Sequence, residues 1–166
     1  MTKIYFMLLV VACSVMPGVA AGCAIDGNID KHRQVDETCE ESWVVHGNID
    51  DGSTVTLTSL SASIKIDGKI GGGSHVNLIA PNASILIGGG IDGGSTVTLS
   101  TGSGAGIRIN GNINGGSKVC LNAGGSVFIT GEIDGEGTEV YWQGISITAR
   151  VGQHGVPVLE KAACSM

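Results

Sequence analysis

The feature that most constrains the fold is an internal repeat of about 21 residues. A glycine recurs in one phase at intervals of 20, 21, 21, 22 and 20 residues, and an isoleucine stands two positions after each glycine. The columns are Gly27, Gly47, Gly68, Gly89, Gly111 and Gly131, and Ile29, Ile49, Ile70, Ile91, Ile113 and Ile133. A glycine held in phase six times predicts a turn position with positive φ.

Two alternating segments in each repeat predict two strands. Segments such as residues 53–57, Ser-Thr-Val-Thr-Leu, place apolar side chains at every second position after the isoleucine. Segments such as residues 64–66, Ile-Lys-Ile, do the same just before the glycine. The inward columns of the first kind are Val35, Val55, Val76, Val97, Val119 and Val140, then Leu57, Leu78, Leu99, Leu121 and Trp142.

The constant phase of these columns predicts coils stacked on one another. Stacking places like residues about 4.8 Å apart and closes an apolar interior that no single short strand could bury. A left-handed helix of hexapeptides would need coils of about 18 residues. We therefore predict an all-β fold, a single-stranded, right-handed parallel β-helix (solenoid) of about six coils of about 21 residues.

The chain divides into four parts. Residues 1–21 carry Lys3, an apolar stretch and small residues before a cleavage point, as a signal peptide does. Residues 22–41 predict an N-terminal cap coil, since Glu37 stands at the phase of the inward Leu57. Residues 42–153 form the β-helix repeats, and residues 154–166 predict a C-terminal tail or cap, with Gln153 at the phase of Ile133.

These features predict a secreted or periplasmic protein, or one at the cell surface. Cys13 and Cys23 each follow residues similar to a bacterial lipobox, so a lipid anchor at either is the alternative. The chain has 9 basic and 15 acidic residues, and loss of Lys3 with the leader leaves 8 basic residues. This negative charge disfavours nucleic acid and anionic membranes as partners.

Four cysteines remain after residue 21, namely Cys23, Cys39, Cys120 and Cys164. An even number in an exported chain predicts two disulfides, although four cysteines allow three connectivities. Proximity favours Cys23 with Cys39, which leaves Cys120 for Cys164. No Cys-x-x-Cys pair is present and the histidines are not at ligand spacing, so we expect no metal site.

Several outward positions invite a functional interpretation. Thr54-x-Thr56 and Thr96-x-Thr98 are similar to the arrays of ice-binding β-helices, but His75 and Lys118 interrupt them. The column Asp30, Asp50, Gly71, Asp92, Asn114 and Asp134 would suit a cation, yet aspartate beside glycine is also ordinary turn chemistry. Arg108 would suit an enzyme that cleaves acidic polysaccharides, but its column neighbours are not carboxylates. We predict no catalytic residue and no cofactor.

One outward column predicts a partner surface. It runs Lys65, Leu86, Arg108, Phe128 and Thr148, and it exposes two large apolar side chains in a chain poor in aromatic residues. Either the C-terminal tail covers them or they contact a partner. Tyr141, outward on the other strand, completes the candidate partner surface of Leu86, Arg108, Phe128 and Tyr141.

The Gly-x-Ile turns and Val-x-Leu ladders resemble those of secreted and surface-exposed bacterial β-helix proteins, adhesin-like heads among them. This resemblance concerns architecture only and transfers no functional residue. We expect a non-enzymatic binding or structural module that recognises a glycan or a surface protein. The alternative is a self-assembling coat or filament subunit, and a polysaccharide-active enzyme or an ice-binding protein is a weaker one.

Overall fold

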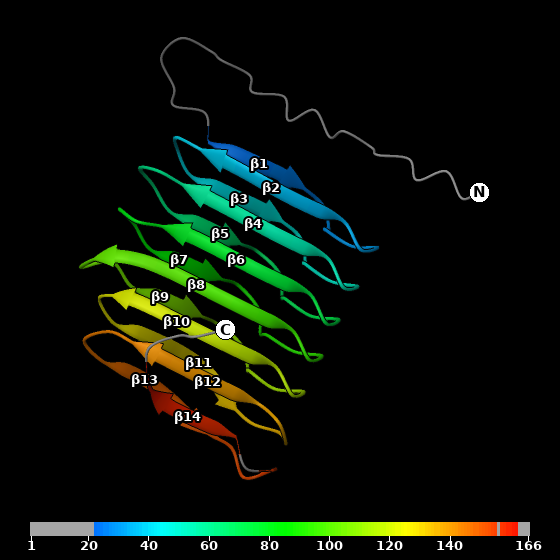
Figure 1. Cartoon of the computed structure of the whole chain (residues 1–166), viewed down its shortest axis with the longest axis vertical. Helices are drawn as coiled ribbons and strands as arrows, with labels where there is room; N and C mark the ends of the chain where they lie inside the picture. Colours follow the sequence, from blue (N-terminus) through cyan, green and yellow to red (C-terminus); the bar gives the residue numbers. More distant parts are fainter. Residues whose placement is uncertain (1–21, 156, 163–166) are drawn as a thin grey trace.

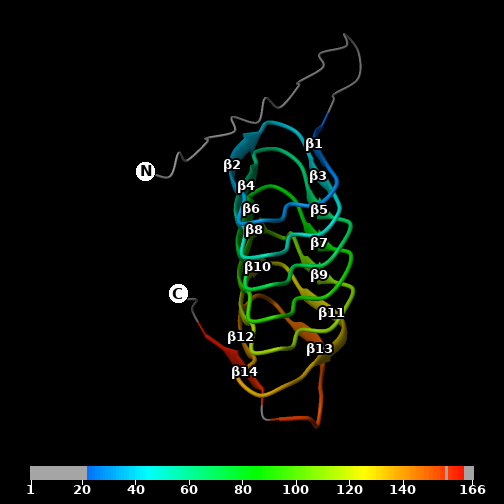
Figure 2. The ribbon, with the colours of Figure 1, turned by 90° about the vertical axis from the view of Figure 1, so that its right-hand side faces the viewer.

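The chain forms a β-solenoid of about seven turns. The computed structural model describes residues 22–155 and 157–162, and these residues form strands and turns without a helix. Figure 1 shows the coils stacked along one axis, and Figure 2 shows the two sheets facing each other across a narrow interior. None of the described residues forms a helix that is long and apolar enough to cross a membrane.

Each coil gives one strand to each of two seven-stranded parallel sheets. Sheet A contains β1 (Cys23–Asp26), β3 (Trp43–His46), β5 (Ile64–Ile66), β7 (Ile85–Ile87), β9 (Ile107–Ile109), β11 (Val127–Ile133) and β13 (Ile147–Val151). Sheet B contains β2 (Gln34–Cys39), β4 (Thr54–Ser59), β6 (His75–Ala80), β8 (Thr96–Ser103), β10 (Lys118–Gly124), β12 (Glu139–Gln143) and β14 (Val158–Lys161).

The strand register confirms the predicted columns. In sheet B, Val35 pairs with Val55 and Val76 with Val97, so like side chains stack from coil to coil. The isoleucine column forms a third, short side through parallel bridges from Ile29 to Ile133. These three columns are buried and make one continuous core between the sheets. The predicted fold class is therefore confirmed, with about seven turns where six were expected.

The seventh turn comes from a segment that we expected to be a tail or cap. Residues 158–161 form β14, which pairs in parallel with β12. The isoleucine column also continues one step further than predicted, because a bulge in β11 aligns Ile133 with Val151 and not with Gln153.

The glycine column is explained by close approach between coils and not, as predicted, by positive φ. Of its six members only Gly27 has positive φ, at 84°. A Cβ on Gly47 would lie 2.5 Å from the backbone of Gly27, and one on Gly111 would lie 2.5 Å from the nitrogen of Gly90. The coils pack so tightly at this corner that a side chain there would collide with the coil before it.

Positive φ occurs instead at the following corner, where three coils have two consecutive glycines, at residues 72–73, 93–94 and 115–116. Gly93 and Gly94, for example, have φ of 65° and 73°. The next residue points inward and is a fully buried serine or threonine, in the column Ser53, Ser74, Ser95, Ser117 and Thr138. The Oγ of Ser95 donates to the Asp92 carbonyl at 2.8 Å, which closes the corner. The repeated Gly-Ser pair is a sequence signal for this column that our prediction did not use.

Candidate functional site

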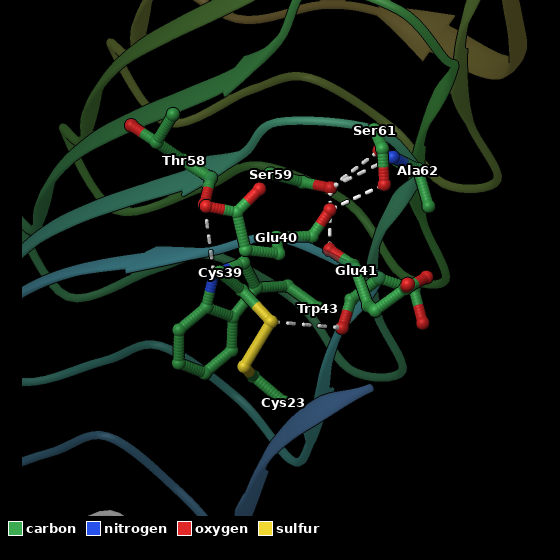
Figure 3. Close-up of a disulfide and its surroundings, with 10 residues drawn as sticks. Cys23, Cys39, Glu40, Glu41, Trp43, Thr58, Ser59, Ser61 and Ala62 are labelled. Carbon is green, nitrogen blue, oxygen red and sulfur yellow. Dashed lines mark hydrogen bonds between the residues drawn. A yellow bond between two sulfur atoms is a disulfide. The ribbon is translucent and has the colours of Figure 1, made fainter. Parts of the chain in front are cut away.

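The N-terminal end of the solenoid is closed by a disulfide. Cys23 in β1 and Cys39 in β2 are joined, with their Cα atoms 6.2 Å apart, so the bond ties sheet A to sheet B (Figure 3). Trp43 lies beneath, fully buried, and its Nε1 donates to the Thr58 carbonyl at 3.0 Å. The predicted Cys23–Cys39 pair is thus confirmed.

The same disulfide bears on the predicted lipid anchor. The Sγ of Cys23 is bonded to Cys39 and is not available for a thioether in this state. Cys13 and Cys164 lie outside the described residues, so the other lipobox and the pairing of Cys120 with Cys164 stay predictions.

Two charged side chains occupy inward phases of the first coil. Glu37, half-buried, pairs in register with Leu57 and so stands at the end of the leucine column. Arg33 stands at the phase of the buried Ser53, and its guanidinium donates to the Asn28 carbonyl at 3.2 Å. The Arg33 side chain therefore reaches back across the corner to Asn28. The next residue, Ile29, is fully buried. Polar groups and a disulfide together stand at this end of the core.

The C-terminal end is finished differently. Three large apolar residues of the last coil are exposed, namely Ile145 at 75%, Val151 at 53% and Val158 at 40%. Lys161 stands at the end of the leucine column, in register with Trp142, and its ammonium lies 5.0 Å from the centre of that ring. This end presents apolar side chains together with the exposed side chains of Arg150 and Lys161.

The outer face of sheet A carries the predicted partner column. The register places Leu86 beside Arg108 and Arg108 beside Phe128 on adjacent strands. The guanidinium carbon of Arg108 lies 4.9 Å from the centre of the Phe128 ring, a cation–π contact, and its Nε donates to Asn110 at 2.6 Å. Phe128 is 39% exposed and Arg108 is exposed, so the pair faces solvent.

A charged cluster continues this face toward the N-terminal end. Asp67 accepts from the Lys65 ammonium at 2.6 Å and contacts the Nδ1 of His46 at 2.8 Å. The hydrogen bonds from Lys65 and then from His46 hold the pKa of Asp67 below its ordinary value of 3.8. The carboxylate therefore stays charged beside the Lys65 ammonium and the His46 ring.

Tyr141 lies away from the other three predicted residues, in β12 of sheet B. Its hydroxyl contacts Glu139 at 3.4 Å, and the negative charge of Glu139 raises the pKa of Tyr141 above its ordinary value of 10.0. The candidate residues thus belong to two faces: Leu86, Arg108 and Phe128 to sheet A, and Tyr141 to sheet B.

The aspartate column is occupied by a side chain of the protein itself. The Lys69 ammonium lies 3.3 Å from Asp92 and 3.9 Å from Asp50, two coils apart. Gly71 separates these carboxylates, and a Cβ there would lie 2.5 Å from Asp92. The described residues contain no group of three or more His, Cys, Asp or Glu side chains placed to hold a metal ion.

The threonine pairs of sheet B are separated in space as they are in sequence. In the outer column Thr54 is followed by His75, then Thr96, then Lys118. Two threonine-bearing strands are therefore never adjacent at this position between β4 and β10, and the hydroxyls do not form an unbroken array.

The chain was compared with known proteins at three levels. No protein-family model, no curated protein and no solved structure matches it. The candidate sites therefore rest on the chemistry of this chain alone.

Proposed function

We propose that the protein is an exported, non-enzymatic binding module that holds a glycan on the outer face of sheet A. The leader-like pattern of residues 1–21 supports export, and a disulfide that closes the first coil fits an oxidising compartment. Export would place the rod outside the cell, in the periplasm or at the cell surface.

The stacked pair of Arg108 and Phe128 carries this proposal. An exposed aromatic ring on a flat sheet offers a platform for the C–H face of a sugar ring. The guanidinium beside it offers several N–H donors to hydroxyl or carboxylate oxygens. Leu86 extends the platform by one coil, so the column can contact successive units of a chain that lies along the rod.

The neighbours of Arg108 support a binding role over catalysis. Cleavage of acidic polysaccharides would need carboxylates beside the arginine to move protons. The column instead places an apolar residue on each side of it, Leu86 and Phe128. A surface protein is the competing partner for this face, since Leu86 and Phe128 would also suit a protein interface.

Glycan-array binding of the purified protein tests the proposal. Phe128→Ala and Arg108→Ala should each weaken binding by about tenfold or more, because both remove the central contact of a small interface. Tyr141→Ala is the matched control, since it removes an aromatic side chain from the opposite sheet and should leave binding within about twofold.

Three outcomes would contradict the proposal: no glycan bound by the wild type, equal binding by wild type and Phe128→Ala, or a loss that follows Tyr141→Ala. Turnover of an acidic polysaccharide by the wild type that disappears in Arg108→Ala would overturn the non-enzymatic role. Capture of a protein partner that depends on Phe128 would replace the glycan with a surface protein.

A further inference from the structure

Among the described residues, no further strand pairs with the sheet edges at either end of the rod. β1 and β2 are the edge strands at the N-terminal end, and β13 and β14 are those at the C-terminal end. Such edges carry free backbone N–H and C=O groups that can pair with another chain. Because every ladder of the solenoid is parallel, a second copy placed head to tail would continue both sheets in the same sense.

We propose that the rods stack head to tail, with Lys161 of one copy meeting Glu37 of the next. Both residues belong to the leucine column, which runs through register pairs from Glu37 and Leu57 to Trp142 and Lys161. The column therefore has an anion at one end and a cation at the other. When a second copy is placed along the rod axis so that its coils continue the stack, these two charges meet.

The apolar columns agree with the same arrangement. Val151 ends the isoleucine column and is more than half exposed, whereas Ile29 begins it and is fully buried. Head-to-tail stacking would bring Val151 of one copy onto the end of the column that begins with Ile29 of the next. It would also place β2 beside β14, so that the half-buried Leu159 at the end of the valine column meets Val35 of the next copy.

The net charges of the two ends favour this arrangement over its rivals. The first coil, residues 22–41, carries six carboxylates and two basic side chains, whereas residues 144–162 carry Arg150 and Lys161 against Glu160. A head-to-head contact would oppose two strongly negative ends, and a tail-to-tail contact would oppose two positive ones. Only the head-to-tail contact joins opposite signs.

A head-to-tail contact does not close on itself. When the step between copies is a translation along the rod with a rotation about it, the contact repeats and produces a filament. The sheet faces stay open in such a filament, so the Arg108–Phe128 pair would recur along it. The proposed stacking rests on the proposed export, because removal of residues 1–21 would leave Gly22 as the first residue at the N-terminal end of the rod.

The test uses the full chain, expressed with its first 21 residues in an exporting host, and begins with the intact mass of the product. Light scattering after chromatography then follows the average molar mass over a wide range of concentrations. The variants are Glu37→Lys, Lys161→Glu and the double reversal. Glu132→Lys, an exposed residue between the ends, is the control for net charge.

The wild-type mass should rise with concentration without a plateau, and each single reversal should require about tenfold more protein to reach the same mass. The double reversal should restore assembly, and Glu132→Lys should leave it within about twofold of wild type. A monomer at every concentration, a plateau at twice the monomer mass, or single reversals without effect would overturn the stacking. A product that retains residues 1–21 would overturn export, whether or not it forms filaments, whereas a monomer made after these residues are removed would overturn the stacking alone.

Discussion

The two ends of the isoleucine column differ sharply although the column itself is uniform. Ile29 at the N-terminal end is fully buried, whereas Val151 at the C-terminal end is 53% exposed. The first coil covers its core with inward polar side chains, Arg33 and Glu37, and a disulfide between the sheets. The last coil has no such disulfide between β13 and β14 among the described residues, and its apolar side chains face outward.

Burial at a solenoid end therefore depends on the groups that cross the open coil as well as on the ladder. Every inner coil is covered on both sides by its neighbours, so its side chains need only the right phase. An end coil has a neighbour on one side only. The N-terminal coil compensates with the Cys23–Cys39 disulfide and with Arg33, which reaches back to the Asn28 carbonyl, whereas the C-terminal coil leaves apolar side chains exposed.

The largest expected effect comes from truncating the buried end of the column. Ile29→Ala should lower the free energy of unfolding by about 2 to 5 kcal/mol, because it removes a fully buried side chain and leaves a cavity. The matched Val151→Ala should cost less than about 1 kcal/mol, because most of that side chain is already in water. Urea unfolding of both variants checks the pair, and equal costs would contradict the difference between the ends.

The Cys23–Cys39 disulfide should contribute a comparable amount to the free energy of unfolding. Replacing both Cys23 and Cys39 by serine should lower the free energy of unfolding by about 3 kcal/mol, as expected for a loop closed at a sequence separation of 16. The loss should appear first as local opening of β1 and β2. A variant that unfolds from the C-terminal end, with β1 and β2 still protected, would show that the disulfide is not what closes the cap.

Replacing Arg33 should change the free energy of unfolding by a smaller amount. Arg33→Ser introduces the residue that most other coils use at this phase, yet it removes the guanidinium that reaches the Asn28 carbonyl. We expect a loss of about 1 kcal/mol in thermal or urea unfolding. Arg33→Lys keeps the charge and should recover part of it. A serine variant as stable as the wild type would show that the cap does not depend on this side chain.

The smallest expected effect is the pH dependence of the hydrogen bonds that Asp134 accepts at the last corner of the solenoid. Desolvation acts to raise the pKa of Asp134, but hydrogen bonds from the Gly135 and His154 N–H groups, and from the His154 ring, outweigh it and lower the pKa below 3.8. The stabilisation is therefore complete above pH 3.8 and is lost as the pH falls through the lower folded value. Amide chemical shifts of Gly135 and His154 should move in that window, and Asp134→Asn should abolish the movement.

Much of the fold follows from sequence periodicity. The valine, leucine and isoleucine columns give strand positions and facing sides directly, because a parallel stack requires like residues at like phase. The outward neighbours of Arg108, Leu86 and Phe128, follow from the same register. The short last coil escaped prediction because a bulge in β11 shifts its phase and β14 contains only four residues.

Other features depend on distances that no periodic pattern reports. The conformation of the glycine column could not be read from sequence, because tight packing and positive φ both exclude a side chain. Gly47 avoids the backbone of the coil before it, whereas Gly93 adopts positive φ. The role of Arg33 was also missed, since only the folded corner shows its guanidinium reaching back to Asn28.

Hydrogen exchange across the two sheets tests the central claim most directly. The measurement would use wild-type protein at a concentration where scattering shows single molecules. For the amides that are hydrogen-bonded within the sheets, a solenoid closed at one end predicts slow exchange from β1 and β2 through β12, and fast exchange confined to β13 and β14. Equally fast exchange at both ends, or β14 exchanging as slowly as β8, would show that the two ends are not closed differently.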